Sequence, residues 1–278
     1  QAVGRAVGRK GGAGLGAVLT VHRVRGEPAA VKTNLERKYG EKNCFHLWRT
    51  ILSNTVATVH YGIIHSMKNL VIIGAGGFGR EMFAAAREAV GYGENFRIKG
   101  FLDGNPSALD GFPGYPPIIG APETYDIAED DVFVTALGNI ATRRRCAGMI
   151  EERGGRFIPV VHRSASLGPN VTVGDGSFIA HNVVLTADIK VGRHSCVFHG
   201  TVIGHDTELA DYTHVYSLVS VGGGVLIGEG ASVFPGARIV PRVEVGAGAT
   251  VGIGSAVVRD VSPGTTVFGV PAERLRIM

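Results

Sequence analysis

A histidine followed directly by an aspartate, His205-Asp206, is the residue pair in this sequence best suited to catalysis. Imidazole has an ordinary pKa of ~6.5, so it can accept a proton at neutral pH. A neighbouring carboxylate can fix the tautomer of the ring and stabilise its charged form. A second histidine, His214, follows nine residues later. The pair predicts a general base that takes the proton from an attacking amine or hydroxyl group.

His205 belongs to a strict repeat of six residues. Between Ala165 and Asp260 the sequence divides into sixteen consecutive units, and the third residue of each unit is aliphatic. This period fits neither an α-helix, which repeats every ~3.6 residues, nor a globular sheet with loops of varying length. It predicts a β-solenoid in which each unit forms a short strand and a corner, and three units form one triangular coil. The inward-pointing residues are expected to be Leu167, Val173, Ile179, Leu185, Val191, Val197, Ile203, Leu209, Val215, Val221, Ile227, Val233, Ile239, Val245, Val251 and Val257.

A coil of about eighteen residues also predicts which residues stack on one another. Gly223 lies eighteen residues after His205, so its backbone N–H should lie beside that histidine, where it can donate to an oxyanion. His181 and His199 have the same spacing, and we interpret them as stacked surface corners, with contacts to the acyl donor as the alternative. His205 could likewise be a plain solvated corner, but Asp206, His214 and Gly223 all occur in the phase that catalysis needs.

Residues 67–160 show a different pattern, in which strands and helices alternate. This order predicts a small parallel α/β domain over residues 67–160, followed by the solenoid domain over residues 161–278. Strands are expected at residues 70–73, 97–102, 132–137 and 156–161, and helices at residues 80–89 and about 142–152.

A glycine-rich turn, Gly74-Ala75-Gly76-Gly77-Phe78-Gly79, joins the first expected strand to the first helix. Such a turn lets the backbone approach a diphosphate, and the helix N-terminus supplies unpaired N–H donors. Asp103 closes the second strand, and Asn139 follows the third. The domain is too short for a full dinucleotide site, so we expect a mononucleotide-sized ligand. A tight turn that binds nothing is the alternative.

Charge and composition limit the classes of function. Residues 1–66 contain ten Lys or Arg and three acidic residues. Residues 67–278 contain eighteen Lys or Arg and twenty-one acidic residues. The formal charge of +4 therefore indicates no nucleic-acid partner, and no apolar run is long enough for a membrane span. Cys44, Cys146 and Cys196 form no C-x-x-C pair, which argues against a disulfide framework or a thiolate zinc site and favours the cytoplasm.

The first 66 residues are basic and rich in Gly and Arg, and Met67 is the first methionine. We interpret residues 1–66 as a disordered leader, or as sequence upstream of the true start. A targeting peptide is the less favoured alternative, because no small-residue cleavage site stands out.

The repeat and the closing segment at residues 263–272 resemble the hexapeptide-repeat acyltransferases, which fold as a left-handed parallel β-helix. With the glycine-rich turn included, residues 67–278 resemble the bacterial sugar O- and N-acyltransferases, a family with sialic-acid O-acetyltransferases and nucleotide-sugar N-acetyltransferases. The resemblance implies a homotrimer that binds acetyl-CoA between neighbouring subunits and transfers the acetyl group directly. In that family the front domain binds the sugar or nucleotide part of the acceptor.

The resemblance also implies roles for single residues. His205 would be the general base and Asp206 would orient it, while His214, Gly223 and Gly224 would lie at the acyl donor. The residues implied for the acceptor site are Gly74, Gly76, Gly77, Phe78, Asp103 and Asn139. No metal is expected. Because an amine and a hydroxyl group need the same base, N-transfer and O-transfer are both compatible with this sequence.

Two other classes of function stay open at this point. Hexapeptide solenoids of the carbonic-anhydrase type bind zinc through three histidines across a trimer interface, and this chain could supply such ligands. Their histidine spacing differs, however, and they lack the front domain. A non-catalytic scaffold is the other alternative, and the intact His-Asp pair argues against it. The histidines available to a zinc site are His181, His194, His199, His205 and His214.

Overall fold

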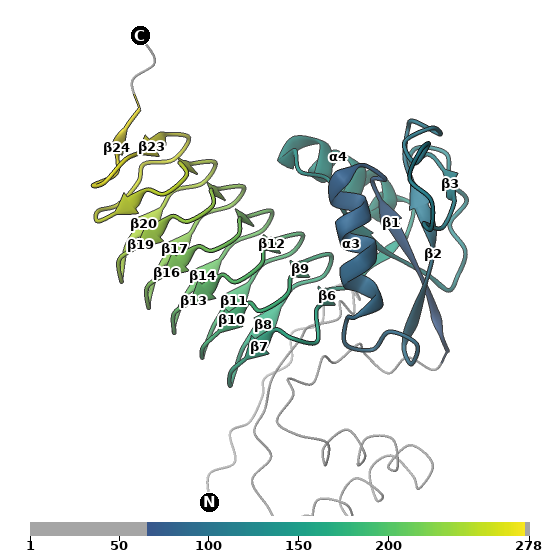
Figure 1. Ribbon diagram of the computed structural model, residues 1–278, viewed down its shortest axis with the longest axis horizontal. Coiled ribbons are helices and arrows are strands. Elements are labelled where there is room, and N and C mark those ends of the chain that lie inside the picture. Colours follow the sequence, from purple (N-terminus) through teal and green to yellow (C-terminus); the bar gives the residue numbers. More distant parts are fainter. Residues whose placement is uncertain (1–65, 276–278) are drawn as a thin grey trace, which may run out of the picture.

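The computed structural model describes residues 66–275, and the interpretation of residues 1–66 as a leader therefore lies outside the described residues except at Ser66. Figure 1 shows an α/β region next to the first coils of a long solenoid. Neither helix of the described region has the length and apolar character that a membrane crossing requires.

The α/β region contains a parallel sheet in the order β3-β2-β1-β4-β5. One helix covers each face, because Leu70 and Ile72 share a core with α3 whereas Val71 and Ile73 pack with residues of α4. The elements are β1 (Lys68–Ile73), α3 (Gly77–Arg87), β2 (Phe96–Leu102), β3 (Ile118–Gly120), β4 (Asp131–Thr135), α4 (Ile140–Glu152) and β5 (Arg156–Phe157).

Two details differ from the sequence-based expectation. The sheet has an additional edge strand, β3, which is only three residues long and half-buried, so it has no clear hydrophobic pattern. The strand expected at residues 156–161 is two strands: β5 joins the front sheet and β6 (Val160–Val161) joins the solenoid. Pro159 lies between them, and proline cannot donate a backbone hydrogen bond to a continuous ladder.

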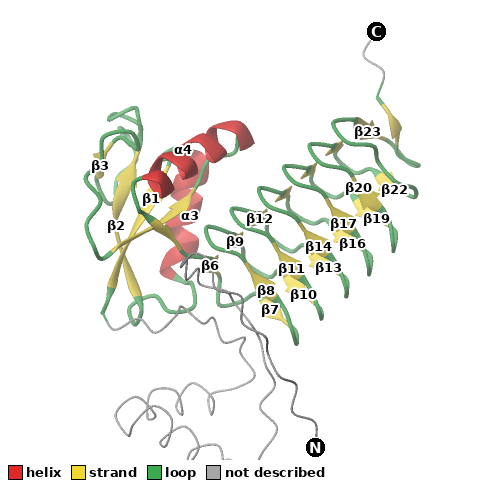
Figure 2. Cartoon of the chain, turned by 180° about the vertical axis from the view of Figure 1, so that it is seen from behind, coloured by secondary structure: helices red, strands yellow, loops and turns green. Residues whose placement is uncertain are grey.

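The solenoid is a parallel β-helix with three faces, each a ladder of strands that are two residues long except for β23, which has three (Figure 2). We name the faces by their ladders: the six-stranded face (β7 to β22), the five-stranded face (β8 to β20) and the eight-stranded face (β6 to β24). The strands after β6 are β7 (Ser166–Leu167), β8 (Thr172–Val173), β9 (Phe178–Ile179), β10 (Val184–Leu185), β11 (Lys190–Val191), β12 (Cys196–Val197), β13 (Val202–Ile203), β14 (Glu208–Leu209), β15 (His214–Val215), β16 (Ser220–Val221), β17 (Leu226–Ile227), β18 (Ser232–Val233), β19 (Arg238–Ile239), β20 (Glu244–Val245), β21 (Thr250–Val251), β22 (Ala256–Val257), β23 (Thr266–Phe268) and β24 (Glu273–Arg274).

The aliphatic repeat fills the solenoid interior, as expected. All sixteen predicted residues except the half-buried Leu167 of the first coil are buried. Parallel pairing places Leu185 between Leu167 and Ile203, its equivalents eighteen residues before and after. The predicted coil length is therefore confirmed.

Corner geometry depends on the fourth and sixth residues of each unit. A Cβ atom on the fourth residue Gly204 would lie 2.6 Å from the nitrogen of Gly223 in the next coil, so the close approach of the coils requires glycine there. In every unit but the last, the sixth residue has a left-handed backbone, which glycine, asparagine and aspartate adopt most readily. Asp206, with φ of 58°, is one of these residues.

The front region packs on the eight-stranded face of the solenoid. Phe78 at the start of α3 contacts Phe178 and Phe198, with ring centroids 5.9 and 5.1 Å apart. Glu151 at the end of α4 forms an ion pair with Arg193. A single hydrophobic cluster runs from β1 and α3 through the interior of the solenoid, so the two regions share a core.

The outward and inward residues of one solenoid strand should differ sharply in their effect on stability. Ile239 is buried and Arg238 beside it is exposed. We expect Ile239→Ala to lower the free energy of unfolding by about 2–5 kcal/mol, because it leaves a cavity in the aliphatic ladder. Arg238→Ala, the matched control, should change it by less than about 0.5 kcal/mol. Chemical denaturation measures both, and equal losses would contradict the assigned strand orientation.

Candidate active site

His205 and Asp206 lie at the corner between β13 on the six-stranded face and β14 on the five-stranded face. The imidazole Nδ1 is 2.7 Å from Oδ2 of Asp206, and both side chains are about two-thirds exposed, at 69% and 66%. The left-handed backbone of Asp206 brings its carboxylate next to the ring. With its Nδ1 hydrogen donated to the carboxylate, the imidazole presents Nε2 as a proton acceptor.

Gly223 lies directly against this imidazole. A Cβ atom at Gly223 would be 2.7 Å from both Cε1 and Nε2 of His205, so only glycine leaves the ring in place. The N–H of the next residue, Gly224, donates to the carbonyl oxygen of His205 at 2.7 Å. Within residues 66–275 the Gly223 N–H has no hydrogen-bond acceptor. The expected stacking is confirmed, and it places an unused N–H donor beside the base.

His214 does not join this group within one chain. It lies in β15 on the eight-stranded face, where it is 2% exposed. Its Nδ1 is 3.1 Å from Nη1 of Arg143, a fully buried residue of α4. Burial, and secondly the charge of Arg143, lower the pKa of His214 to about 3. His214 is therefore a neutral residue between the two regions of the chain.

The glycine-rich turn combines two glycines that packing requires with two that border open space. A Cβ atom at Gly74, whose φ is +104°, would be 2.8 Å from the carbonyl oxygen of Ala136, and one at Gly79 would collide with the Gly74 carbonyl. No atom lies within 4 Å of a Cβ atom built at Gly76 or Gly77. Because α3 begins at Gly77 without a side-chain cap, its first N–H groups are available to an anion.

The other three residues expected at the acceptor site have partners inside the fold. Asp103 accepts a hydrogen bond of 2.8 Å from the N–H of Ala75 and thereby holds the turn. Asn139 caps α4, accepting from the N–H of Thr142 at 2.9 Å. The ring of Phe78 packs against the solenoid. Gly76 and Gly77 therefore form the open part of the predicted acceptor site.

His181 and His199 stack as expected, with ring centroids 4.9 Å apart, and His162 extends the column at 3.9 Å. Both lie at corners of the solenoid, as expected, and both are half-buried. Glu81 of α3 lies 3.2 Å from Nε2 of His199, so that corner also contacts the front region. Desolvation lowers the pKa of His162 and of His199. Within the part of the chain that the structure describes, no group of three His, Cys, Asp or Glu side chains could hold a metal ion.

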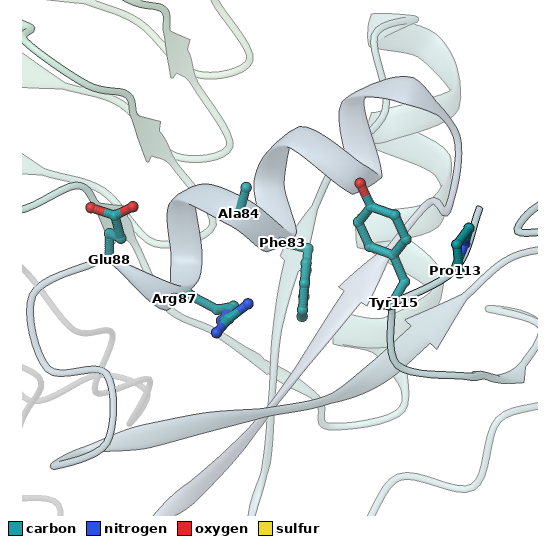
Figure 3. A pocket seen from close by; sticks show the side chains of 7 residues that line it. Phe83, Ala84, Arg87, Glu88, Pro113 and Tyr115 are labelled. Carbon is teal, nitrogen blue, oxygen red and sulfur yellow. The ribbon is translucent and has the colours of Figure 1, made fainter.

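A cavity of about 500 Å³ lies along the second half of α3 (Figure 3). The rings of Phe83 and Tyr115 and the guanidinium of Arg87 border it in the figure. It contains none of the residues that the sequence predicts for the site. The lining residues are Phe83, Ala84, Arg87, Glu88, Pro113, Gly114 and Tyr115.

Comparisons with known proteins agree with both regions of the fold. Residues 69–150 match the family of PglD N-terminal domains. Over 117 residues the chain is 31% identical to UDP-N-acetylbacillosamine N-acetyltransferase of Bacillus subtilis (strain 168), covering 41% of this chain and 51% of that protein. The chain thus spans about half the length of this curated relative.

Two solved structures extend the similarity to the solenoid. PerB from Caulobacter crescentus, in complex with CoA and GDP-perosamine, is 27% identical with a TM-score of 0.64, covering 75% of this chain and 97% of that chain. The acetyltransferase domain of PglB from Neisseria gonorrhoeae FA1090, in complex with acetyl coenzyme A, is 26% identical with a TM-score of 0.68. The match covers 76% of this chain and 100% of that chain. The expected left-handed β-helix with a Rossmann-like front domain is confirmed.

The buried, neutral His214 predicts a loss of stability in acid. Its pKa is lower in the folded chain, at about 3, than its ordinary value of 6.5, so unfolded chains bind more protons between these values and stability falls as pH falls. We expect His214→Asn, whose amide oxygen can still accept from Arg143, to remove about 1.4 kcal/mol per pH unit of this dependence. Denaturation between about pH 7 and about pH 4 measures the slope. If the free energy of unfolding changes with pH equally in the wild type and in His214→Asn, then His214 is not the origin of the loss of stability in acid.

Proposed function

We propose that this chain, which has the fold and the front domain of the PglD-like hexapeptide-repeat sugar acyltransferases, is an acetyl-CoA-dependent acetyltransferase acting on a nucleotide-linked sugar. The observation that carries the proposal is the group formed by His205, Asp206 and Gly223 at one exposed corner. The named functions of the relatives, which are sugar N-acetyltransferases in Bacillus and in Caulobacter, support an amine as the acceptor.

We further propose that each region binds one substrate: residues 67–160 bind the acceptor, and residues 161–278 bind the acyl donor. The open backbone at Gly76 and Gly77, at the N-terminus of α3, suits the diphosphate of a nucleotide sugar. The turn and the helix ends that border this site would be held in place by Gly74, Phe78, Asp103 and Asn139. A GDP-linked sugar bound to PerB supports the same ligand class here.

In the proposed reaction the amine of the sugar attacks the thioester carbonyl carbon, so a C–N bond forms and the C–S bond to CoA breaks. Nε2 of His205 removes a proton from the attacking nitrogen, and Asp206 stabilises the resulting imidazolium. The imidazolium then gives this proton to the sulfur of the departing CoA, which restores the neutral ring. The unused N–H of Gly223 donates to the carbonyl oxygen as negative charge develops there. Gly224 holds the His205 backbone through its own hydrogen bond.

The proposed site requires two copies of the chain. The base lies at the corner between the six-stranded and five-stranded faces, whereas the front region packs on the eight-stranded face. In a three-sided solenoid a corner lies opposite the remaining face, so the glycine-rich turn of one chain cannot reach its own His205. We infer that a neighbouring copy supplies the acceptor site, and we favour the homotrimer that the family resemblance implies.

A cytoplasmic location is also proposed. The described cysteines, Cys146 and Cys196, are both buried and unpaired, which suits a reducing compartment. The proposed substrates, acetyl-CoA and a nucleotide sugar, would meet the enzyme in the cytoplasm. Burial raises the pKa of the Cys196 thiol, so this residue is suited to packing and not to nucleophilic attack.

Release of free CoA from acetyl-CoA tests the activity, with a panel of nucleotide-linked amino sugars and free sugars as acceptors. We expect turnover with one acceptor class, and a loss of about 10²–10⁴-fold in kcat for His205→Ala. Gly223→Ala should reduce turnover as well, because the added Cβ atom displaces the ring of His205. Gly148→Ala, where a Cβ atom meets open space, is the matched control. Full activity of His205→Ala, or no turnover with any acceptor, would overturn the proposal.

Mixed oligomers test whether the site is shared between copies. His205→Ala removes the base, and Gly77→Glu places a negative charge where the diphosphate would bind, so neither variant should be active alone. Co-expressed chains should regain about a quarter of the wild-type activity, since half the corners and half the front regions remain intact. A site formed within one chain predicts no recovery in the mixture.

A further inference from the structure

Histidine is concentrated where α3 and α4 of the front region meet the first coils of the solenoid (Figure 1). Among residues 66–275, only His205 lies away from this junction. Three of the junction rings are at most 3% exposed, namely His162, His194 and His214. Each of the three contacts a charged residue in or directly after a front-region helix, and these residues are Glu88, Glu151 and Arg143.

His194 fits the junction only as a neutral ring. Its Nε2 lies 3.3 Å from Oε1 of Glu151 in α4, so the hydrogen of the neutral ring is donated there. Its Nδ1 is buried and has no hydrogen-bond partner among the described residues. A Cβ atom at Gly176 would be only 2.4 Å from this nitrogen. A second proton would therefore lie on a tightly packed nitrogen without an acceptor, which costs free energy.

His162 and His214 use Nδ1 as an acceptor. Nδ1 of His162 accepts from the N–H of Ser164 at 3.1 Å, and Nδ1 of His214 lies 3.1 Å from Nη1 of Arg143. A backbone N–H and a guanidinium offer only donors. A proton added at either Nδ1 atom would point at another donor, so it would break the contact that the neutral ring makes.

The charges around these rings act in both directions. The carboxylates of Glu88 and Glu151 favour a protonated ring, whereas His181, stacked 3.9 Å from His162, opposes one. Desolvation is the largest influence on all three rings, and it holds the pKa of each below the ordinary value of 6.5. The arginines that also oppose protonation are Arg163 at His162, Arg193 and Arg143 at His194, and Arg143 at His214.

We propose that the junction is a proton-sensitive contact: in acid, His162, His194 and His214 take up protons, and α3 and α4 separate from the first coils while the outer coils stay folded. The aliphatic ladder of the solenoid contains no ionisable group, so acid has no equivalent target there. Apolar contacts such as that of Phe78 with Phe198 oppose the separation. The consequence for transfer rests on the proposed function, because a separated front region no longer holds the acceptor for the base of a neighbouring copy.

Hydrogen exchange followed by mass spectrometry between about pH 7 and about pH 5 tests the inference. The rates are corrected for the chemical exchange rate of free amides. We expect the protection of α3 and α4 to fall with pH, because the separated state binds more protons, and each ring contributes up to about tenfold per pH unit. Strands β19 to β22 should keep their protection. Equal loss of protection in the helices and in these strands would mean global unfolding and would overturn the inference.

Two variants identify the groups that take up the protons. The amide nitrogen of His194→Gln can still donate to Glu151, and the amide oxygen of His162→Asn can still accept from Ser164, but neither side chain titrates. Each substitution should reduce the pH dependence of protection by up to about tenfold per pH unit. His205→Asn, which replaces an exposed ring at the opposite corner, is the matched control and should leave the dependence unchanged. A wild-type pH dependence in both variants would overturn the inference.

Acetyl transfer is measured separately, at about pH 7, where the junction is expected to be intact. If the wild type transfers no acetyl group there, the proposed function fails. The exchange measurement needs no substrate, so it still decides whether protons open the junction.

Discussion

The stacking of one aliphatic residue per six-residue unit is the interaction on which the rest of this structure depends. Because each buried residue must lie above its equivalent in the previous coil, the chain advances by one fixed length per turn. Outward-facing residues at the same spacing are then brought together without any long-range recognition of their own. The contact of Gly223 with His205 and the stack of His181 on His199 both arise in this way.

This regularity gives the His205 corner a precise backbone geometry. Backbone atoms of neighbouring coils approach so closely at Gly204 that no side chain fits, and the left-handed residue that follows the base is an aspartate with its carboxylate against the imidazole. Rigid backbone therefore positions the His205 imidazole, the Asp206 carboxylate and the Gly223 N–H donor. The front region packs on the eight-stranded face, opposite this corner, and contributes no residue to it within one chain.

The junction between the two regions differs from the aliphatic interior of the solenoid, because it buries polar groups. Arg143, His214 and the column from His162 to His199 all lie where α3 and α4 meet the eight-stranded face. Desolvation lowers the pKa of His162, His199 and His214, so these three rings favour the neutral form beside the buried guanidinium of Arg143. Such an interface is specific in orientation, because hydrogen bonds depend on direction more strongly than apolar contacts.

The sequence by itself determined the solenoid, its coil length, the glycine-rich turn, and the grouping of His205, Asp206 and Gly223, because all of these follow from local spacing. Only the tertiary structure decided the surroundings of His214, His181 and His199, the inward packing of Phe78, and the burial of Arg143. Those residues meet across the junction of two separately patterned regions. Contacts between distant elements depend on how whole surfaces fit together, and a local repeat carries no information about that fit.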